Sequence, residues 1–299
     1  MSRSAPATSS RPAGLEVPRG LSAAHLTEIA SLEAACLASD GGRLKLEFPV
    51  LRARDPDVAS DFLWRGAAGE LLGFLGIYQN QPTEVEICGM VHPEHRRQQI
   101  FSRLLEAALA ELRLRGNPRV LLIVDRSCEA GVGFATARGG VVDSSEYRMR
   151  QHEAPGLQGV HEELALRQAT ASRADLDFLR DCIRRGFHVP EEAIAADDWV
   201  ARAKETLVIE QAGVPVGVMR VDRDLEASEA GIYGFVVLPE LQGRGIGRGA
   251  LSVITRAVRD EGIASVHLEV LVDNPAALHL YETCGFEASG IEDYYLIAL

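Results

Sequence analysis

The sequence has no long apolar run and few cysteines, and both absences exclude classes of protein. No stretch approaches the ~20 apolar residues that a membrane-spanning helix needs, so we expect no membrane partner. The five cysteines are scattered, without a CxxC pair or a Cys/His cluster. We therefore expect neither a disulfide framework nor a zinc or other metal site. The N-terminal residues lack the apolar core of a secretory signal. These absences favour the reducing cytoplasm.

Basic charge is also scarce, since the formal net charge is −12. Nucleic-acid binding needs a basic stripe that displaces counterions, and the sequence has none, so we expect no nucleic-acid partner. An acidic chain suits a cationic small substrate, although most acidic proteins are acidic for solubility. The hydrophobic content of 46% and charged content of 25% are ordinary for a globular protein.

The chain repeats itself at a constant offset of 146 residues, which aligns Pro93 with Pro239. The same offset aligns Arg96 with Gln242, Ile100 with Ile246, Leu105 with Leu251, Val120 with Val266 and Gly139 with Gly285. One offset without a gap indicates two copies of one domain. We therefore expect a disordered tail at residues 1–14 and domains at 15–150 and 164–299, joined by a linker at 151–163 that contains Pro, Gly and charges.

Hydrophobic periodicity predicts the same local order in both copies. In the second copy, the apolar run 231–238 predicts a buried strand, residues 250–258 have helical spacing, and 265–272 predict another strand. The first copy repeats this with a helix over 101–112 and a strand over 120–124. Strand, helix and parallel strand form a βαβ unit, so the fold class is α/β.

A glycine-rich turn lies between strand and helix in the second copy. Glycines let the backbone approach an anion, and the N–H groups at a helix N-terminus point toward it. The turn therefore predicts a pyrophosphate cradle formed by Gln242, Gly243, Arg244, Gly245, Ile246, Gly247 and Arg248. A flexible loop is the alternative without function. A dinucleotide site is a further alternative, because Gly245, Gly247 and Ala250 form GxGxxA, but six residues separate Leu238 from Gly245 where that fold has almost none.

Two motifs resemble the GNAT superfamily of N-acetyltransferases. The family's pyrophosphate loop, Gln/Arg-x-x-Gly-x-Gly/Ala, matches residues 242–247. A later segment, Asn-x-x-Ala-x-x-x-Tyr-x-x-x-Gly-Phe, matches Asn274, Ala277, Tyr281, Gly285 and Phe286. The resemblance covers 164–299 well and 15–150 weakly. It implies two tandem GNAT-like domains, each with a mixed sheet of the α+β type, flanked by helices and splayed between its fourth and fifth strands.

The resemblance also implies acetyl-CoA as cosubstrate and a small-molecule amine as acceptor. The pantetheine arm would pair with the backbone of Phe235, Val236 and Val237, and Gly234 in the same strand indicates a bulge or a close approach to ligand. Tyr281 would protonate the leaving thiolate or, in the alternative, pack in the core. Asn274 would hold the pantetheine or only cap the following helix.

The general base has to come from a position other than the family's usual one. Many family members have a carboxylate at the position of Gly231, so we take Glu229, two residues earlier on the same strand face, as the candidate base. Tyr233 or a water chain are alternatives. Because that carboxylate is missing, a non-catalytic acyl-CoA-binding sensor or scaffold remains the alternative function.

The first copy departs from both motifs. Gln99 and Phe101 stand where the loop needs small residues, and Ala135 stands at the Tyr281 position. We expect this copy to be structural or to shape the acceptor pocket. Cys284 is interpreted as a packing residue, because no nearby His in the motif would activate it. The oligomeric state does not follow from the sequence.

Overall fold

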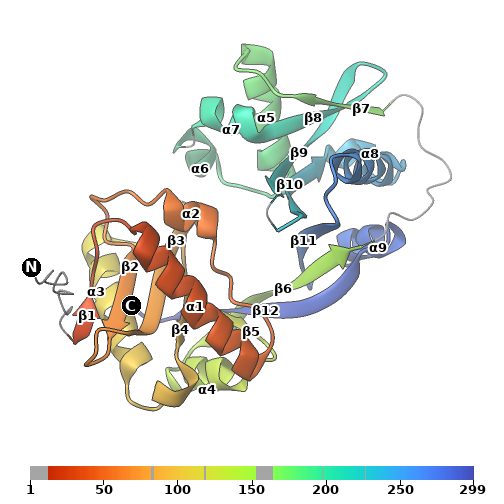
Figure 1. The fold of residues 1–299 in the computed structure, drawn as a ribbon. Coiled ribbons are helices and arrows are strands. Elements are labelled where there is room, and N and C mark those ends of the chain that lie inside the picture. Colours follow the sequence, from red (N-terminus) through yellow and green to blue (C-terminus); the bar gives the residue numbers. More distant parts are fainter. Residues whose placement is uncertain (1–12, 82–83, 118, 153–163, 197, 226) are drawn as a thin grey trace, which may run out of the picture. The chain divides into compact units, whose positions relative to one another are not determined.

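The computed structural model describes residues 13–81, 84–117, 119–152, 164–196, 198–225 and 227–299. Most of the expected N-terminal tail and of the expected linker lies outside these residues. The chain divides into two compact units (Figure 1). The first comprises the chain up to Asp143 together with Glu292–Leu299, and the second is Ser144–Ile291.

The first unit has a mixed sheet with the strand order β1-β2-β3-β4-β5-β12. The strands are β1 (Gly14–Glu16), β2 (Asp61–Arg65), β3 (Leu71–Gln81), β4 (Glu84–Val91), β5 (Val120–Asp125) and β12 (Glu287–Ile297). Only β4 and β5 pair in parallel, while the other neighbours are antiparallel. This confirms the mixed sheet and the βαβ unit, since a helix connects β4 to β5.

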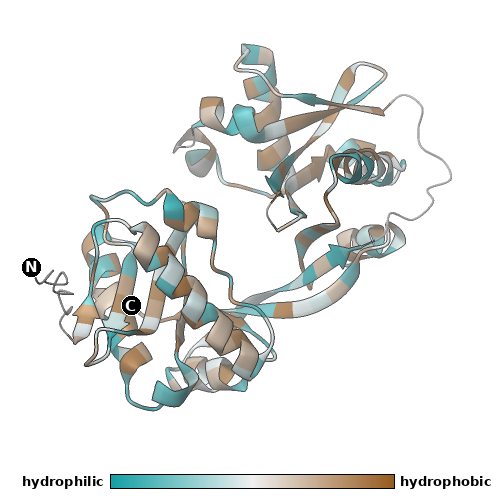
Figure 2. Ribbon diagram, viewed as in Figure 1, coloured by the Kyte–Doolittle hydropathy of each residue, from teal (hydrophilic) through white to brown (hydrophobic). Residues whose placement is uncertain are grey.

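Helices cover both faces of this sheet. The helices are α1 (Ala23–Asp40), α2 (Phe48–Arg52), the 3₁₀ turn η1 (Pro93–His95), α3 (Ile100–Arg115) and α4 (Glu129–Ala137). Leucines of α3 such as Leu104 pack on one face, and Ile29 of α1 packs on the other. The buried strands therefore read as apolar runs rather than as alternating ones, and they are coloured mainly brown in Figure 2, whereas α1 carries both colours.

The second unit repeats this plan with the strand order β6-β11-β10-β9-β8-β7. The strands are β6 (Val141–Gln151), β7 (Leu164–Gln168), β8 (Thr206–Gln211), β9 (Val214–Asp224), β10 (Glu229–Val237) and β11 (Ser265–Leu271). The helices are α5 (Arg173–Gly186), α6 (Glu191–Ala196), α7 (Trp199–Glu205), the 3₁₀ turn η2 (Pro239–Leu241), α8 (Ile246–Asp260) and α9 (Pro275–Thr283). Helices α8 and α9 pack on one face and α5, α6 and α7 on the other.

The last strand of each repeat joins the sheet of the other copy. Strand β6 pairs with β11, with Glu146 opposite Leu271, and β12 pairs with β5, with Glu292 opposite Asp125. The two registers agree under the offset of 146 residues. The compact units therefore differ from the continuous segments 15–150 and 164–299. Periodicity indicates that a segment is a strand, but long-range hydrogen bonding decides which sheet it joins.

None of the helices in the described parts of the chain is both long and apolar enough to cross a membrane.

Candidate functional site

The sheet of the second unit opens where the resemblance predicts. Strands β10 and β11 pair in parallel from Glu229 as far as Ile232 and Leu268, although both continue beyond this point. Gly234 has φ +56°, and the pairing of β10 with β9 shifts register between Tyr233 and Val236. The predicted bulge is therefore present. It lies just before residues 235–237, the segment that should face a pantetheine arm.

The glycine-rich loop leaves the end of β10 and begins α8. Gly243 and Gly245 have φ of +73° and +81°, and a Cβ at Gly243 would meet nothing within 4 Å. Gly245 is the N-cap of α8 and offers no side chain to the first N–H groups. Those donors and the positive end of the helix dipole therefore remain available to an anion.

Both arginines of the loop are exposed. Arg244 donates to the carbonyl oxygen of Glu240 at 3.0 Å, and Arg248 donates to the hydroxyl of Thr283 at 3.1 Å. Each has further N–H groups on a delocalised guanidinium, so each can still bind a phosphate.

Tyr281 lies on α9 and is only 8% exposed. Its ring packs edge to face against Phe286 with centroids 6.0 Å apart. Burial, and to a lesser extent Cys284, raises the pKa of Tyr281 to about 12. The phenol therefore stays protonated at neutral pH, as an acid must, while the ring also belongs to the core. The structure thus contains the features of both predicted roles.

Asn274 and Cys284 flank Tyr281 in sequence and have simple structural roles. The side-chain oxygen of Asn274 accepts the backbone N–H of Ala277 at 3.1 Å, which makes it the N-cap of α9. Cys284 is buried, and burial raises the pKa of its thiol. A protonated buried thiol is a poor nucleophile, in agreement with a packing role.

The candidate base Glu229 lies at the start of β10 in a polar cluster. Its Oε1 is 2.7 Å from an Nη of Arg150 on β6, and its Oε2 is 4.0 Å from Nδ1 of His267 on β11. The other ring nitrogen of His267 is 3.3 Å from the hydroxyl of Tyr233. The Tyr233 ring covers Gly231, whose Cβ, if present, would lie 2.5 Å from the ring.

Sequence reasoning did not identify His267. It stands opposite Gly231 in the parallel ladder, so it lies beside the strand position where the family places a carboxylate. The pairing of β10 with β11 was the signal that could have indicated it, but the register is not visible in the sequence.

The loop of the first copy keeps the backbone conformation of the second without its glycines. Arg97 and Gln99 both have φ of +62°, at the positions of Gly243 and Gly245. The Gln99 side chain is exposed, whereas the Phe101 ring packs edge to face against Phe134 with centroids 4.8 Å apart. Side chains thus replace glycine at some energetic cost, because left-handed backbone is unfavourable for non-glycine residues.

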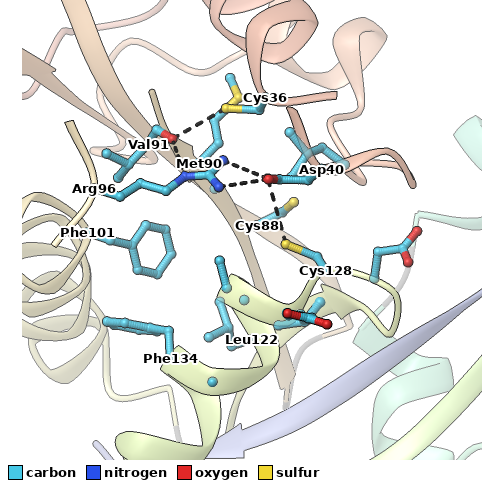
Figure 3. A pocket seen from close by; sticks show the side chains of 18 of the residues that line it. Cys36, Asp40, Cys88, Met90, Val91, Arg96, Phe101, Leu122, Cys128 and Phe134 are labelled. Atoms are coloured by element: carbon cyan, nitrogen blue, oxygen red, sulfur yellow. Dashed lines mark hydrogen bonds and ion pairs between the residues drawn. The ribbon is translucent and has the colours of Figure 1, made fainter. Parts of the chain in front are cut away.

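A cavity of about 600 Å³ lies in the first unit (Figure 3), although every predicted site residue belongs to the second. It occupies the opening beyond Ile87 and Leu122, where β4 and β5 stop pairing. Its lining comes from α1, the segment after α1, β4, the start of α3, β5, α4 and Glu292 of β12. No signal in the sequence indicated this cavity, because the motif residues that mark the site in the second copy are missing here.

One ion pair stands at the wall of this cavity. The Nη atoms of Arg96 donate to both carboxylate oxygens of Asp40 at 2.8 and 2.6 Å, and Nε donates to the carbonyl oxygen of Val91 at 3.1 Å (Figure 3). The Arg96 hydrogen bonds hold the pKa of Asp40 below its ordinary value. The carboxylate is therefore charged at neutral pH.

Within the described residues, one group of side chains could hold a metal ion. His92, Glu94 and His95 surround the turn η1, and their ligand atoms lie within 4.8 Å of one another. The second copy has Leu238 and Leu241 at the two histidine positions. The turn therefore forms without histidine, and the group has no counterpart among the predicted site residues.

Comparisons with family models, with curated proteins and with solved structures all point to acetyltransferases. The family model described as "Acetyltransferase (GNAT) family" matches twice, at residues 28–139 and 175–286. The mycothiol acetyltransferase of Kytococcus sedentarius is 30% identical over 68% of this chain and 72% of its own length. The mycothiol acetyltransferase of Cellulomonas flavigena is 28% identical over 95% of this chain and 89% of its own length. The crystal structure of a GCN5-related N-acetyltransferase from Sphaerobacter thermophilus matches with a TM-score of 0.76, over 93% of this chain and 94% of that one. At 18% sequence identity this match shows a shared fold.

Proposed function

Since this chain belongs to the acetyltransferase (GNAT) family, we propose that its second unit transfers the acetyl group of acetyl-CoA to the amine of a small molecule. The observation that carries the proposal is the glycine-rich loop, held beside the opening between β10 and β11. The loop supplies N–H donors at the start of α8, and the opening supplies strand backbone beyond the paired region. An anionic nucleotide with a long polar arm needs both features.

The proposed binding roles are those that the motifs imply. The loop residues Gln242, Gly243, Arg244, Gly245, Ile246, Gly247 and Arg248 would bind the pyrophosphate, and the backbone of Phe235, Val236 and Val237 would bind the pantetheine arm. Asn274 already caps α9 through its oxygen, so its amide N–H groups are what it can offer to a ligand.

Tyr281 is the proposed general acid. Attack of the amine on the thioester expels a thiolate whose thiol has a pKa of about 8.5, and a neutral phenol can protonate it. Burial keeps Tyr281 neutral, with a pKa of about 12. Backbone N–H groups near Val237 would stabilise the oxyanion of the tetrahedral intermediate.

Glu229 is proposed to act as base through His267 rather than alone. Its carboxylate already binds Arg150, while His267 lies between Glu229 and the hydroxyl of Tyr233. His267 would take the proton of the acceptor ammonium through Tyr233 or water, and Glu229 would stabilise the imidazolium that results. This arrangement replaces the carboxylate that Gly231 cannot supply.

The acceptor class is proposed from the relatives and from charge. Two relatives are named mycothiol acetyltransferases, which favours a small-molecule amine. The net charge of −12 favours an acceptor that is a cation, such as a protonated amine.

The five free cysteines fit the cytoplasm as the compartment.

A thiol-release assay with acetyl-CoA and a panel of small amines tests the proposal. We expect release of CoA thiol that depends on one class of amine, and its loss in a variant whose loop cannot bind the cosubstrate. If acetyl-CoA binds tightly but no amine in a broad panel stimulates thiol release, the alternative of an acyl-CoA-binding sensor or scaffold is correct instead.

A further inference from the structure

Small residues of β4 and α4, among them Gly89 and Gly133, line the cavity of the first unit. The strand and the helix exchange a phenylalanine and a glycine between the two copies. In the first copy Phe101 of α3 lies over Gly89 of β4. In the second copy the equivalent strand residue is Phe235, and it lies over Gly247 of α8. In addition, α4 lines the cavity with residues that include Gly133, and α9 has His279 at that position. The first copy thus has no side chain at the Gly133 position, where the second copy has an exposed histidine.

The interior of the cavity is apolar and is reached from both faces of the sheet. Leu37 of α1 lines it from one side, and Phe101 and Phe134 from the other, with Leu122 of β5 between them. Because β4 and β5 separate here, the cavity extends between the two strands instead of lying as a shallow depression on one face of the sheet. An elongated ligand fits such a space better than a compact one. The volume of about 600 Å³ is large enough for a small-molecule ligand.

The inner charged groups Asp40, Arg43 and Lys45 already have partners within the protein. Asp40 binds Arg96 with two hydrogen bonds. Arg43 lies 3.6 Å from Glu292, and the ammonium of Lys45 donates to the hydroxyl of Tyr294 at 2.6 Å.

Because these charged groups already have partners, the wall does not favour a ligand ion of either sign. A ligand ion that entered the interior would lose its hydration and would have to compete with an existing pair for a counter-ion. The arrangement therefore favours a neutral ligand.

The cysteines of the cavity add to its apolar character. Cys36 and Cys88 are buried, burial raises the pKa of both thiols, and that of Cys88 reaches about 12. A buried protonated thiol behaves as a small hydrophobic group. Cys128, at the Asn274 position of the second copy, is half-buried on the wall and lies 3.9 Å from Asp40 (Figure 3).

We propose that this cavity is a binding site for a neutral, chain-shaped apolar molecule, separate from the acetyl-CoA site of the second unit. Phe101 and Phe134 would contact the chain, while the Asp40–Arg96 pair would offer hydrogen bonds to a neutral polar end such as an ester or hydroxyl. The proposal does not depend on acetyl transfer. The first copy has Ala135 in place of Tyr281, the proposed general acid, which is consistent with a change of ligand in this copy.

Displacement of the neutral fluorescent dye Nile red by added competitors tests the site. We expect Nile red to bind with one site per chain and methyl decanoate to displace it. Decanoate, with the same chain but a carboxylate, should be weaker by about tenfold or more, because its charge would have to be desolvated and would compete with the existing pairs.

A matched pair of variants locates the binding. Gly133 lies on α4 and lines the cavity, and a Cβ there would meet nothing within 4 Å, so Gly133→Phe should fold and obstruct the space. Thr136→Phe places the same ring on an exposed position of the same helix outside the lining. We expect Gly133→Phe to weaken dye and ester binding by roughly tenfold or more, the scale of overfilling a packed site, and Thr136→Phe to bind like the parent.

Protection of Cys128 gives a readout on the unmodified chain. Methyl decanoate should slow its alkylation by N-ethylmaleimide, measured by mass spectrometry of the peptide. The proposal is overturned if methyl decanoate neither displaces Nile red nor protects Cys128, or if both phenylalanine variants bind like the parent. It is also overturned if acetyl-CoA displaces the dye at micromolar concentration, since the cavity would then be a second acetyl-CoA site.

Discussion

The side-chain amide of Gln242 donates a 3.0 Å hydrogen bond to the carbonyl oxygen of Val237, which ties the start of the glycine-rich loop to the end of β10. The first copy makes the same connection, with Nε of Arg96 3.1 Å from the carbonyl oxygen of Val91. The first motif position thus has a structural role in both copies, independent of any ligand. Beyond this anchor the two loops differ, because residues with side chains stand in the first copy where the second has glycines.

We predict that Gly245→Glu abolishes acetyl-CoA binding while the fold remains nearly intact. A carboxylate at the N-cap of α8 would occupy the cradle and repel the pyrophosphate. Calorimetric titration with acetyl-CoA measures the effect, and circular dichroism monitors the fold. Unchanged affinity in the folded variant would show that the loop is not the cradle.

The matched control for this variant is Gly245→Gln. The first copy has Gln99 at this position with φ +62°, so the backbone accepts glutamine there. Glutamine and glutamate differ in charge but hardly in size. Binding that is lost in the glutamate variant and only weakened in the glutamine variant would assign the loss to charge.

We predict one high-affinity acetyl-CoA site per chain, in the second unit. The glycines of its loop leave the cradle open, whereas the loop of the first copy carries Gln99 and Phe101. Titration of the parent should give a stoichiometry near one, and Gly245→Glu should reduce it toward zero. Two equivalent sites, or binding that survives in Gly245→Glu, would contradict this assignment.

We predict that Tyr281→Phe lowers turnover far more than it weakens acetyl-CoA binding. The phenol acts on charge that appears on sulfur only as the thioester breaks, so its loss affects the transition state. The expected loss in kcat is about 10²–10⁴-fold. The ring remains, so packing against Phe286 and the melting temperature should change little. Turnover within a few-fold of the parent would make Tyr281 a packing residue only.

The pH profile gives a second test of Tyr281. Its pKa is raised to about 12, so the acid form persists well above neutrality and is lost only as pH rises toward that value. Ionisation of Tyr281 should therefore not lower kcat between pH 7 and about pH 10, so the profiles of the parent and of Tyr281→Phe should have the same shape over this range. A fall in kcat over this range that is present only in the parent would mean that the phenol titrates much earlier than its burial allows.

We predict that His267→Leu lowers kcat/KM at pH 7 by roughly 10²-fold or more without changing acetyl-CoA affinity. The first copy has Leu121 at this position, so leucine suits the strand. The deficit should shrink as pH rises, because the acceptor amine then loses its proton without help. Glu229→Gln should have a smaller effect of about tenfold, since it removes only the charge behind the imidazole.

The measurement is initial rate against pH with a good acceptor, for both variants and the parent. Equal rates at all pH values would remove His267 and Glu229 from the mechanism. A loss that stays constant with pH would indicate a structural role instead of proton transfer.

Much of the fold was predictable, because the signals are local. The alternation of strand and helix, the bulge at Gly234 and the cap at Asn274 follow from periodicity and from the conformational preferences of single residues. The family was visible in two short motifs, since a pyrophosphate cradle needs glycines at fixed spacing. The site residues that carry these motifs remain predictions, to be tested by the variants above.

Local patterns in the chain were enough to indicate a duplication, a mixed α/β unit in each copy, and motif residues in the second copy only. Three features became visible only in the folded chain: β6 and β12 join opposite sheets, His267 stands beside Gly231, and an open cavity lies in the first copy. The reason is physical: strand type and turn chemistry are local properties. Strand partners and cavities instead depend on contacts between residues that are far apart in the chain, so no single segment of the sequence specifies them.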